Sequence, residues 1–96
     1  MLDLNSTIRA SEDVVVSQLD DELVMMSIEK GQYYGLDDIG SRVWELINEP
    51  RSISSICDVL VSEFDVVRTE CEHDMVEWLS ELAGENLIQI VDGQET

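Results

Sequence analysis

The first part of the chain shows hydrophobic runs with the length and spacing of short strands. Residues 14–19 are mostly β-branched and apolar, and the acidic cluster Asp20-Asp21-Glu22 separates them from a second apolar run at 23–28. Both runs are typical of strands, and the acidic cluster is typical of a tight turn. Gly31 suits the positive φ of a second turn, after which residues 32–36 form a third short strand. The pattern predicts an antiparallel meander of three strands.

From Asp37 onward, the apolar positions follow the period of an α-helix. Asp37 is a suitable N-cap, and this helix is predicted to end at Glu49-Pro50, because the residue before proline avoids the α region. Ser52 caps a second helix. A third begins near Thr69, where Thr69-x-x-Glu72 resembles a capping box, and Asn86 suits a left-handed stop. The predicted core positions are Ile39, Val43, Leu46 and Ile47 in the first helix, with Trp44 on its flank, Ile53, Ile56, Cys57, Leu60 and Phe64 in the second, and Cys71, Met75, Trp78, Leu79 and Leu82 in the third.

The order of these elements defines the expected fold class. Three strands are followed by three helices and by a short apolar segment at 87–91, which predicts an α+β fold with the helices packed on a small antiparallel sheet. A chain of 96 residues forms one domain. Residues 13–91 are assigned to it, residues 1–12 to a flexible N-terminal arm, and residues 92–96 to a tail.

The net charge of the chain excludes some classes of binding partner. Five Lys and Arg residues face 22 Asp and Glu residues, which gives a net charge of −17. Such a surface repels the phosphates of nucleic acids and the headgroups of anionic membranes, so neither is an expected partner. The apolar runs are too short to cross a bilayer, and the N-terminus lacks the basic start of a secretory signal. We therefore expect a cytoplasmic protein with neutral or cationic partners.

The sequence offers no recognisable catalytic or cofactor site. His73 is the only histidine, and Cys57 and Cys71 lie at apolar helical positions that favour reduced, buried thiols over a disulfide. Cys71 and His73 lie two residues apart on one helix, about 200° apart around its axis, so they cannot form a nucleophile pair. A paired zinc-ligand motif and a phosphate-binding glycine loop are absent from the sequence. We predict no enzyme activity, no cofactor and no metal.

Two surfaces are candidates for binding a partner. Acidic residues of the third helix form a narrow stripe beside Trp78, namely Glu70, Asp74, Glu77 and Glu81. The stripe is either a solvated face or an electrostatic rim that receives basic side chains next to an aromatic anchor. The strand over 32–36 has a free edge if nothing covers it, and an extended peptide can pair there. Tyr33, Tyr34 and Leu36 then form pocket walls, unless the tyrosines serve only as core or cross-strand packing.

Residues 31–47 read Gly-Gln-Tyr-Tyr-Gly-Leu-Asp-Asp-Ile-Gly-Ser-Arg-Val-Trp-Glu-Leu-Ile. This is a glycine turn, an aromatic strand, Leu-Asp, a later glycine and a Val-Trp-x-Leu helix, and it resembles the pattern of the PqqD family, which has Leu-Asn/Asp and Ile/Val-Trp-x-Leu at these places. The match continues in Ser52-Ile53-x-x-Ile56, Glu63-Phe64-Asp65 and Trp78-Leu79-x-x-Leu82-x-x-x-Asn86-Leu87-Ile88. It covers residues 13–91. Many relatives have an acidic cap near Val67, which this chain lacks, and a glycine in place of Asn86.

The resemblance implies a winged helix-turn-helix-like, non-catalytic domain that recognises ribosomally made, post-translationally modified peptides. This chain is most similar to the small leader-binding subunit of split lasso-peptide systems. The leader of a precursor peptide is then expected to add as a strand to residues 32–36, against the helix over 70–81. The protein, a monomer or weak homodimer, presents this precursor to a leader peptidase or another modifying enzyme. The resemblance supplies the groove, and the acidic stripe of this sequence supplies the charged contacts. Together they give the predicted contact residues Gln32, Tyr33, Tyr34, Gly35, Leu36, Glu70, Asp74, Met75, Glu77, Trp78 and Glu81.

Other functions fit parts of the sequence. A carrier protein would attach its phosphopantetheine arm to a serine at a helix start, such as Ser41, but carriers are helical bundles and three strands precede this helix. A winged-helix DNA reader is excluded by the acids of the third helix. An acidic interaction protein, such as a DNA mimic that binds a basic partner protein, remains the alternative.

Overall fold

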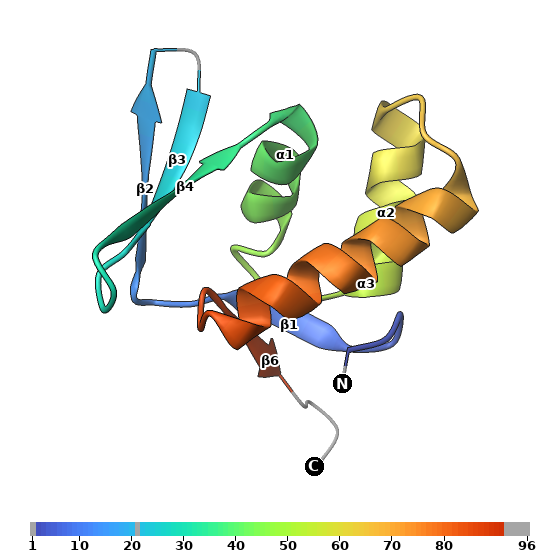
Figure 1. The fold of residues 1–96 in the computed structure, drawn as a ribbon. Helices are drawn as coiled ribbons and strands as arrows, with labels where there is room; N and C mark the ends of the chain where they lie inside the picture. Colours follow the sequence, from blue (N-terminus) through green and yellow to red (C-terminus); the bar gives the residue numbers. More distant parts are fainter. Residues whose placement is uncertain (1, 21, 92–96) are drawn as a thin grey trace.

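The computed structural model describes residues 2–20 and 22–91. Within these residues the fold is α+β, with two small three-stranded antiparallel sheets and three helices (Figure 1). Along the chain the elements are β1 (Thr7–Ala10), β2 (Val14–Leu19), β3 (Glu22–Ser27), β4 (Gln32–Leu36), α1 (Asp38–Leu46), β5 (Arg51–Ser52), α2 (Ile53–Glu63), α3 (Arg68–Gly84) and β6 (Ile88–Val91). No described helix is both long and apolar enough to cross a membrane.

The predicted meander is confirmed as the sheet β2-β3-β4. Its register places Val16 opposite Met25, and Met25 opposite Tyr34, so these three side chains share one face. Met25 is buried, which identifies this face as the one that packs on the helices. Gly31 has φ 67° at the turn between β3 and β4, as expected. At the other predicted turn Asp20 has φ 56°, and its neighbour Asp21 lies outside the described residues.

The caps of the first two helices also agree with the sequence. The Asp37 carboxylate accepts a hydrogen bond from the Gly40 backbone N–H at 2.7 Å, and the Ser52 hydroxyl accepts one from the Ser55 N–H at 3.1 Å. Each cap satisfies a backbone donor that would otherwise lack a partner. The helix α1 ends at Leu46, a few residues before the predicted stop at Pro50.

The predicted capping box at the start of α3 is wrong. The helix begins at Arg68, and its N-cap residue Val67 makes no side-chain capping bond. Glu72, the acid expected to close the box, instead accepts a hydrogen bond from Nε of Arg68 at 2.7 Å, one helical turn away. Arg68 also pairs with Asp58 of α2. The first turn of α3 is therefore held by ion pairs of Arg68 with Glu72 and Asp58, and not by the predicted side-chain cap.

The strand β1 corrects the prediction of a flexible arm over residues 1–12. Thr7–Ala10 pair with β5 on one side and with β6 on the other, and Ile8 is fully buried. Leu2 also lies in the core. The sequence signal was weak because β1 is four residues long and contains one large apolar side chain. Its partners are also distant in sequence, so no hairpin pattern marks it.

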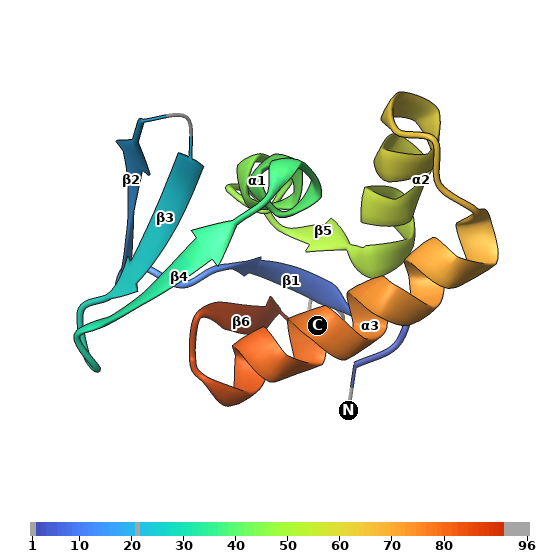
Figure 2. The same cartoon turned by 45° about the horizontal axis from the view of Figure 1, so that its top comes forward.

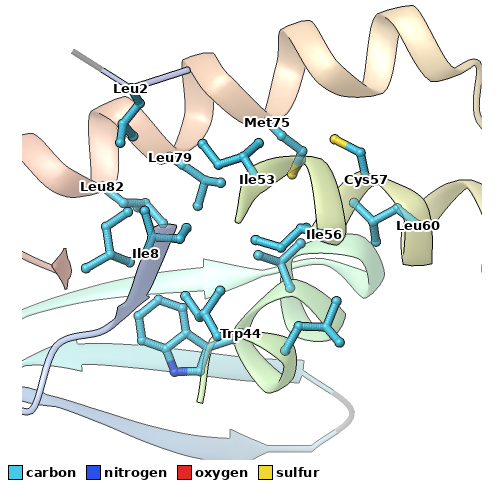
Figure 3. Close-up of a cluster of buried hydrophobic side chains, with 14 of the residues drawn as sticks. Leu2, Ile8, Trp44, Ile53, Ile56, Cys57, Leu60, Met75, Leu79 and Leu82 are labelled. Carbon is cyan, nitrogen blue, oxygen red and sulfur yellow. The ribbon is translucent and has the colours of Figure 1, made fainter. Parts of the chain in front are cut away.

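The core lies where the three helices meet the two sheets. Figures 1 and 2 show α1 between the meander and α2. Figure 3 shows the buried cluster, to which Ile8, Ile53, Ile56 and Leu79 contribute fully buried side chains. Cys57 and Cys71 are both buried with free thiols. Burial, together with the neighbouring Cys71 and Glu72, raises the pKa of the Cys57 thiol to about 12.

Candidate functional site

The meander has a free edge at β4. Among the described strands, β4 pairs only with β3, so its other side carries no strand partner. Alternate residues of an edge strand direct their backbone N–H and C=O groups outward, and these groups can pair with an added strand. The feature predicted for residues 32–36 is therefore present in the fold.

A groove of about 430 Å³ lies beside the end of this strand. Three elements line it: the end of β4 with Gly35 and Leu36, the start of α1, and the middle of α3 with Asp74, Met75 and Trp78. Leu36 and Met75 are 7% and 8% exposed, so the groove has an apolar base. Asp74 is exposed and adds negative charge at its rim. The residues that line the groove include no Lys or Arg.

A smaller hollow of about 220 Å³ extends the groove along α3. The two share three lining residues: Ile39, Asp74 and Met75. The hollow continues to the connection between α2 and α3, where Val67 is 58% exposed, and includes the acidic residue Glu70. The result is an extended surface with apolar side chains inside and carboxylates along α3.

One end of the groove is set by a close approach of α1 to α3. A Cβ atom added to Gly40 would lie 3.5 Å from Cη2 of Trp78 and 3.2 Å from both Cδ2 of Leu36 and the Asp37 carboxylate. Glycine at this position therefore lets the indole and Leu36 pack against the backbone of α1. The Trp78 side chain is partly buried in this position.

Polar contacts connect the β3–β4 turn to the far end of α3. Lys30, in this turn, forms a 2.7 Å ion pair with Glu85, the residue that follows α3. Glu85 also accepts a 3.4 Å hydrogen bond from the Tyr34 hydroxyl, which donates to Gln32 at 2.7 Å. The hydrogen bond between Lys30 and Glu85 raises the pKa of the lysine and lowers the pKa of the carboxyl. These contacts bring the hairpin and α3 together beyond the groove.

The structure brings about half of the predicted site residues together. Gly35, Leu36, Asp74, Met75 and Trp78 line the groove, and Glu70 lines the adjoining hollow. Gln32 and Tyr34 belong to the polar contacts with Glu85. Glu77 and Glu81 are exposed on α3 and do not line the groove.

The two tyrosines of β4 point to opposite faces of the sheet. Tyr34 pairs with the buried Met25 and packs against the core, whereas Tyr33 pairs with Met26 on the other face and is 69% exposed. The Tyr33 side chain therefore lies away from the groove, and only its backbone belongs to the β4 edge.

The sequence did not identify the part of the groove that α1 provides. Asp37 and Ile39 were interpreted as a cap and as a core position, and Gly40 only as part of the family pattern. A glycine inside the first turn of a helix was the available signal, because it permits a close approach that alanine would obstruct.

Among residues 2–20 and 22–91, one group could be considered for a metal. His73, Asp74 and Glu77 are exposed, and one ligand atom from each lies within 4.8 Å of the others. Exposed acids on one helix face commonly lie this close without a metal, and Cys71 is buried elsewhere. The absence of a metal or cofactor stays a prediction.

The sequence profile of coenzyme PQQ synthesis protein D (PqqD) matches residues 22–88, most of the chain. The chain therefore belongs to the PqqD family, as its resemblance predicted. This is a family of non-catalytic peptide-binding domains, which confirms the prediction that the chain is not an enzyme.

Two solved structures share the fold. One is described as TbiB1 in complex with the TbiA(beta) leader peptide. It is 34% identical, the match covers 92% of this chain and 99% of that one, and the TM-score is 0.74. The other, lasso peptide synthetase B1 complexed with the leader peptide, is 23% identical, with coverage of 85% and 96% and a TM-score of 0.74. At that identity it supports the fold alone. No curated protein matches the chain significantly.

Proposed function

We propose that this protein is an adaptor that binds the leader of a ribosomally made precursor peptide. The leader adds as a strand to the free edge of β4 and lies against α3. The adaptor then presents the precursor to a separate modifying enzyme. The observation that carries the proposal is the unpaired edge of β4 beside an apolar groove, in a chain 34% identical to a protein whose structure contains a leader peptide.

In this proposal, backbone pairing and side-chain burial make different contributions to leader binding. Pairing along β4 supplies affinity with little dependence on sequence. Selectivity comes from the groove, where Leu36, Met75 and Trp78 can enclose one apolar or aromatic leader side chain. Burial of such an anchor contributes about 1.5–3 kcal/mol. The remaining predicted contacts act through backbone at Gln32 and Tyr33 and through charge at Glu77 and Glu81.

Charge favours a leader that carries Lys or Arg. Asp74 lies at the groove, and Glu70 lies in the adjoining hollow. Neither faces a cationic residue among those that line these two spaces. A basic leader side chain would therefore meet uncompensated carboxylates, which speeds association and fixes orientation more than it adds affinity.

We further propose that the adaptor acts in lasso-peptide biosynthesis and that the enzyme that receives the precursor is a leader peptidase. The support for this assignment is the sequence resemblance to the small leader-binding subunit of split lasso-peptide systems, together with the 34% identity to a protein whose structure contains a leader peptide. A winged helix-turn-helix-like arrangement also belongs to the proposal. It is supported by the order of α1, α2 and α3 beside the meander, which would take the place of the wing.

The alternative is an acidic protein that imitates DNA and binds a basic protein. The net charge of −17 and the exposed acids of α3 favour it. A mimic needs its carboxylates but not the β4 edge or the apolar groove. The two functions are therefore distinguished by a variant that changes the groove and keeps every charge.

Calorimetric titration with a synthetic leader from the precursor encoded beside this gene tests the proposal. We expect one leader per chain, and a scrambled leader of the same composition should bind far more weakly. Trp78→Ala keeps the charge and removes the anchor wall, so affinity should fall about tenfold or more. Trp78→Phe, the matched control for folding, should bind nearly as tightly as the original chain. Equal binding of the scrambled leader would contradict the proposal.

A further inference from the structure

We infer that the opposite edge of the meander, at β2, is a second docking site, which takes an extended segment of the partner enzyme. This inference rests on the proposed adaptor function. The segment would have an uncharged, β-branched centre and a basic residue at each end.

The β2 strand has the properties of a pairing edge. Among the described strands it pairs only with β3. Its six residues, Val14–Leu19, include no charge and no proline, although the chain carries 27 charged residues in 96. Natural edge strands usually carry charges or proline that block unwanted pairing, and β2 has neither. In Figures 1 and 2 no other labelled element lies along its outer side.

A second groove accompanies this edge, on a different side of α1 from the β4 groove. Its volume is about 750 Å³, and its apolar wall consists of Ala10 from β1, Val14 and Val16 from β2, Leu23 from β3 and Trp44 from α1. The rest of its lining is polar and includes Glu45 and the ion pair of Arg9 with Glu12. It shares no lining residue with the groove beside β4. A strand added to β2 could place alternate side chains against this wall.

Trp44 offers a polar contact inside this groove. Its side chain is 8% exposed, yet none of the hydrogen bonds found among the described residues is donated by the indole N–H. Figure 3 shows the indole nitrogen on the side of the ring away from the other labelled side chains. A buried indole N–H usually has an acceptor, and a backbone carbonyl of an added segment could supply one.

Charge at the two ends of β2 selects the occupant. Asp13 precedes the strand and Asp20 follows it, both exposed. The six ion pairs of the described residues include neither of them. Antiparallel pairing of two copies would place Asp13 of each beside Asp20 of the other, so like charges oppose a homodimer here. A segment with Lys or Arg at both ends would neutralise both acids.

The test uses NMR on the full chain at low ionic strength, with the blocked peptide Lys-Val-Thr-Val-Thr-Val-Lys as the probe. We expect amide shifts in residues 14–18 and a shift of the Trp44 indole N–H, with β4 and α3 unchanged. The same peptide with Glu in place of both Lys should bind several-fold more weakly. Shifts confined to β4 and α3, no shifts at millimolar peptide, or equal binding of the Glu peptide would each overturn the inference.

Two matched variants separate this inference from the proposed function. Asp13→Asn with Asp20→Asn removes two charges at β2, and asparagine tolerates the positive φ at position 20. Asp74→Asn with Glu77→Gln removes two charges at α3. The first pair should weaken binding of the Lys peptide about threefold or more and leave leader binding unchanged. The second pair should weaken leader binding and leave binding of the Lys peptide unchanged.

The outcomes distinguish the two claims. If the leader binds and the Lys peptide does not, only the β2 site fails, whereas failure of the leader alone rejects the proposed function. Dimerisation of the free chain through β2 would identify a second copy as the occupant and reject the inference.

Discussion

The indole of Trp78 on α3 packs against the backbone of Gly40 on α1. Its Cη2 atom lies 3.5 Å from the position that a Cβ atom would take on Gly40. Leu36, at the end of β4, approaches the same position to 3.2 Å. One residue without a side chain therefore brings together the three elements that line the β4 groove, and the shape of this groove depends on it.

Gly40→Ala tests this dependence. The new methyl group would require Leu36 or the Asp37 carboxylate to move by a few tenths of an ångström, and overpacking of this kind typically costs about 1–3 kcal/mol. We expect leader affinity to fall about fivefold or more in calorimetric titration. Gly84→Ala is the control, because a Cβ atom there meets nothing within 4 Å and the residue is also helical. Equal leader affinity of the two variants would contradict the role of Gly40.

The charge argument predicts a salt dependence. Leader binding should weaken as salt rises from low to physiological concentration, because exposed charges are screened over about 8–10 Å. Asp74→Asn with Glu77→Gln should bind more weakly at low salt and should lose most of this dependence. Calorimetry at several salt concentrations measures both effects. An unchanged salt dependence in the variant would show that these acids form only a solvated surface and do not contribute to leader binding.

Cys57 should make the protein less stable in alkali. Burial raises its pKa from an ordinary value near 9.0 to about 12, so the folded state keeps a proton that the unfolded state releases. This contribution to stability is complete below pH 9 and is lost as the pH rises toward 12. Urea unfolding at pH 8 and pH 10 should therefore show a larger loss for the original chain than for Cys57→Ala. Equal losses would show that the thiol titrates normally.

The left-handed backbone conformation at Asn86 should limit which residues this position tolerates. It has φ 62° just after α3, a region that costs most residues about 1–2 kcal/mol. We expect Asn86→Ala to lower the free energy of unfolding by about 1 kcal/mol, and Asn86→Gly to leave it nearly unchanged or to raise it. Thermal or urea unfolding compares the two. A more stable alanine variant would contradict this account.

The parts of the fold that the sequence predicted correctly depend on local chemistry. Asp37 and Ser52 cap their helices, and Gly31 and Asn86 adopt positive φ, because each needs only its immediate neighbours to act. The meander was predictable for the same reason, since its turns are short and its strands are consecutive.

The missed features depend on partners far away in the chain. β1 exists because β5 and β6 pair with it, and Thr7 is opposite both Ser52 and Val91. The helix α3 starts within one residue of the predicted Thr69, but its capping box was wrong because Glu72 bonds to Arg68. The orientation of Tyr33 and Tyr34 follows from register with β3, which no local pattern fixes. The resemblance to the PqqD family supplied the expectation of a groove between β4 and α3, which local patterns alone did not give.

The most direct test of the central claim is an NMR titration of the labelled chain with the leader of the precursor encoded beside this gene. Strand addition predicts amide shifts along Gln32–Leu36 and along α3, a shift of the Trp78 indole N–H, and protection of β4 amides from exchange in the complex. The β2 amides should not change. No shifts at high-micromolar leader, or shifts confined to exposed acids without protection at β4, would contradict the account.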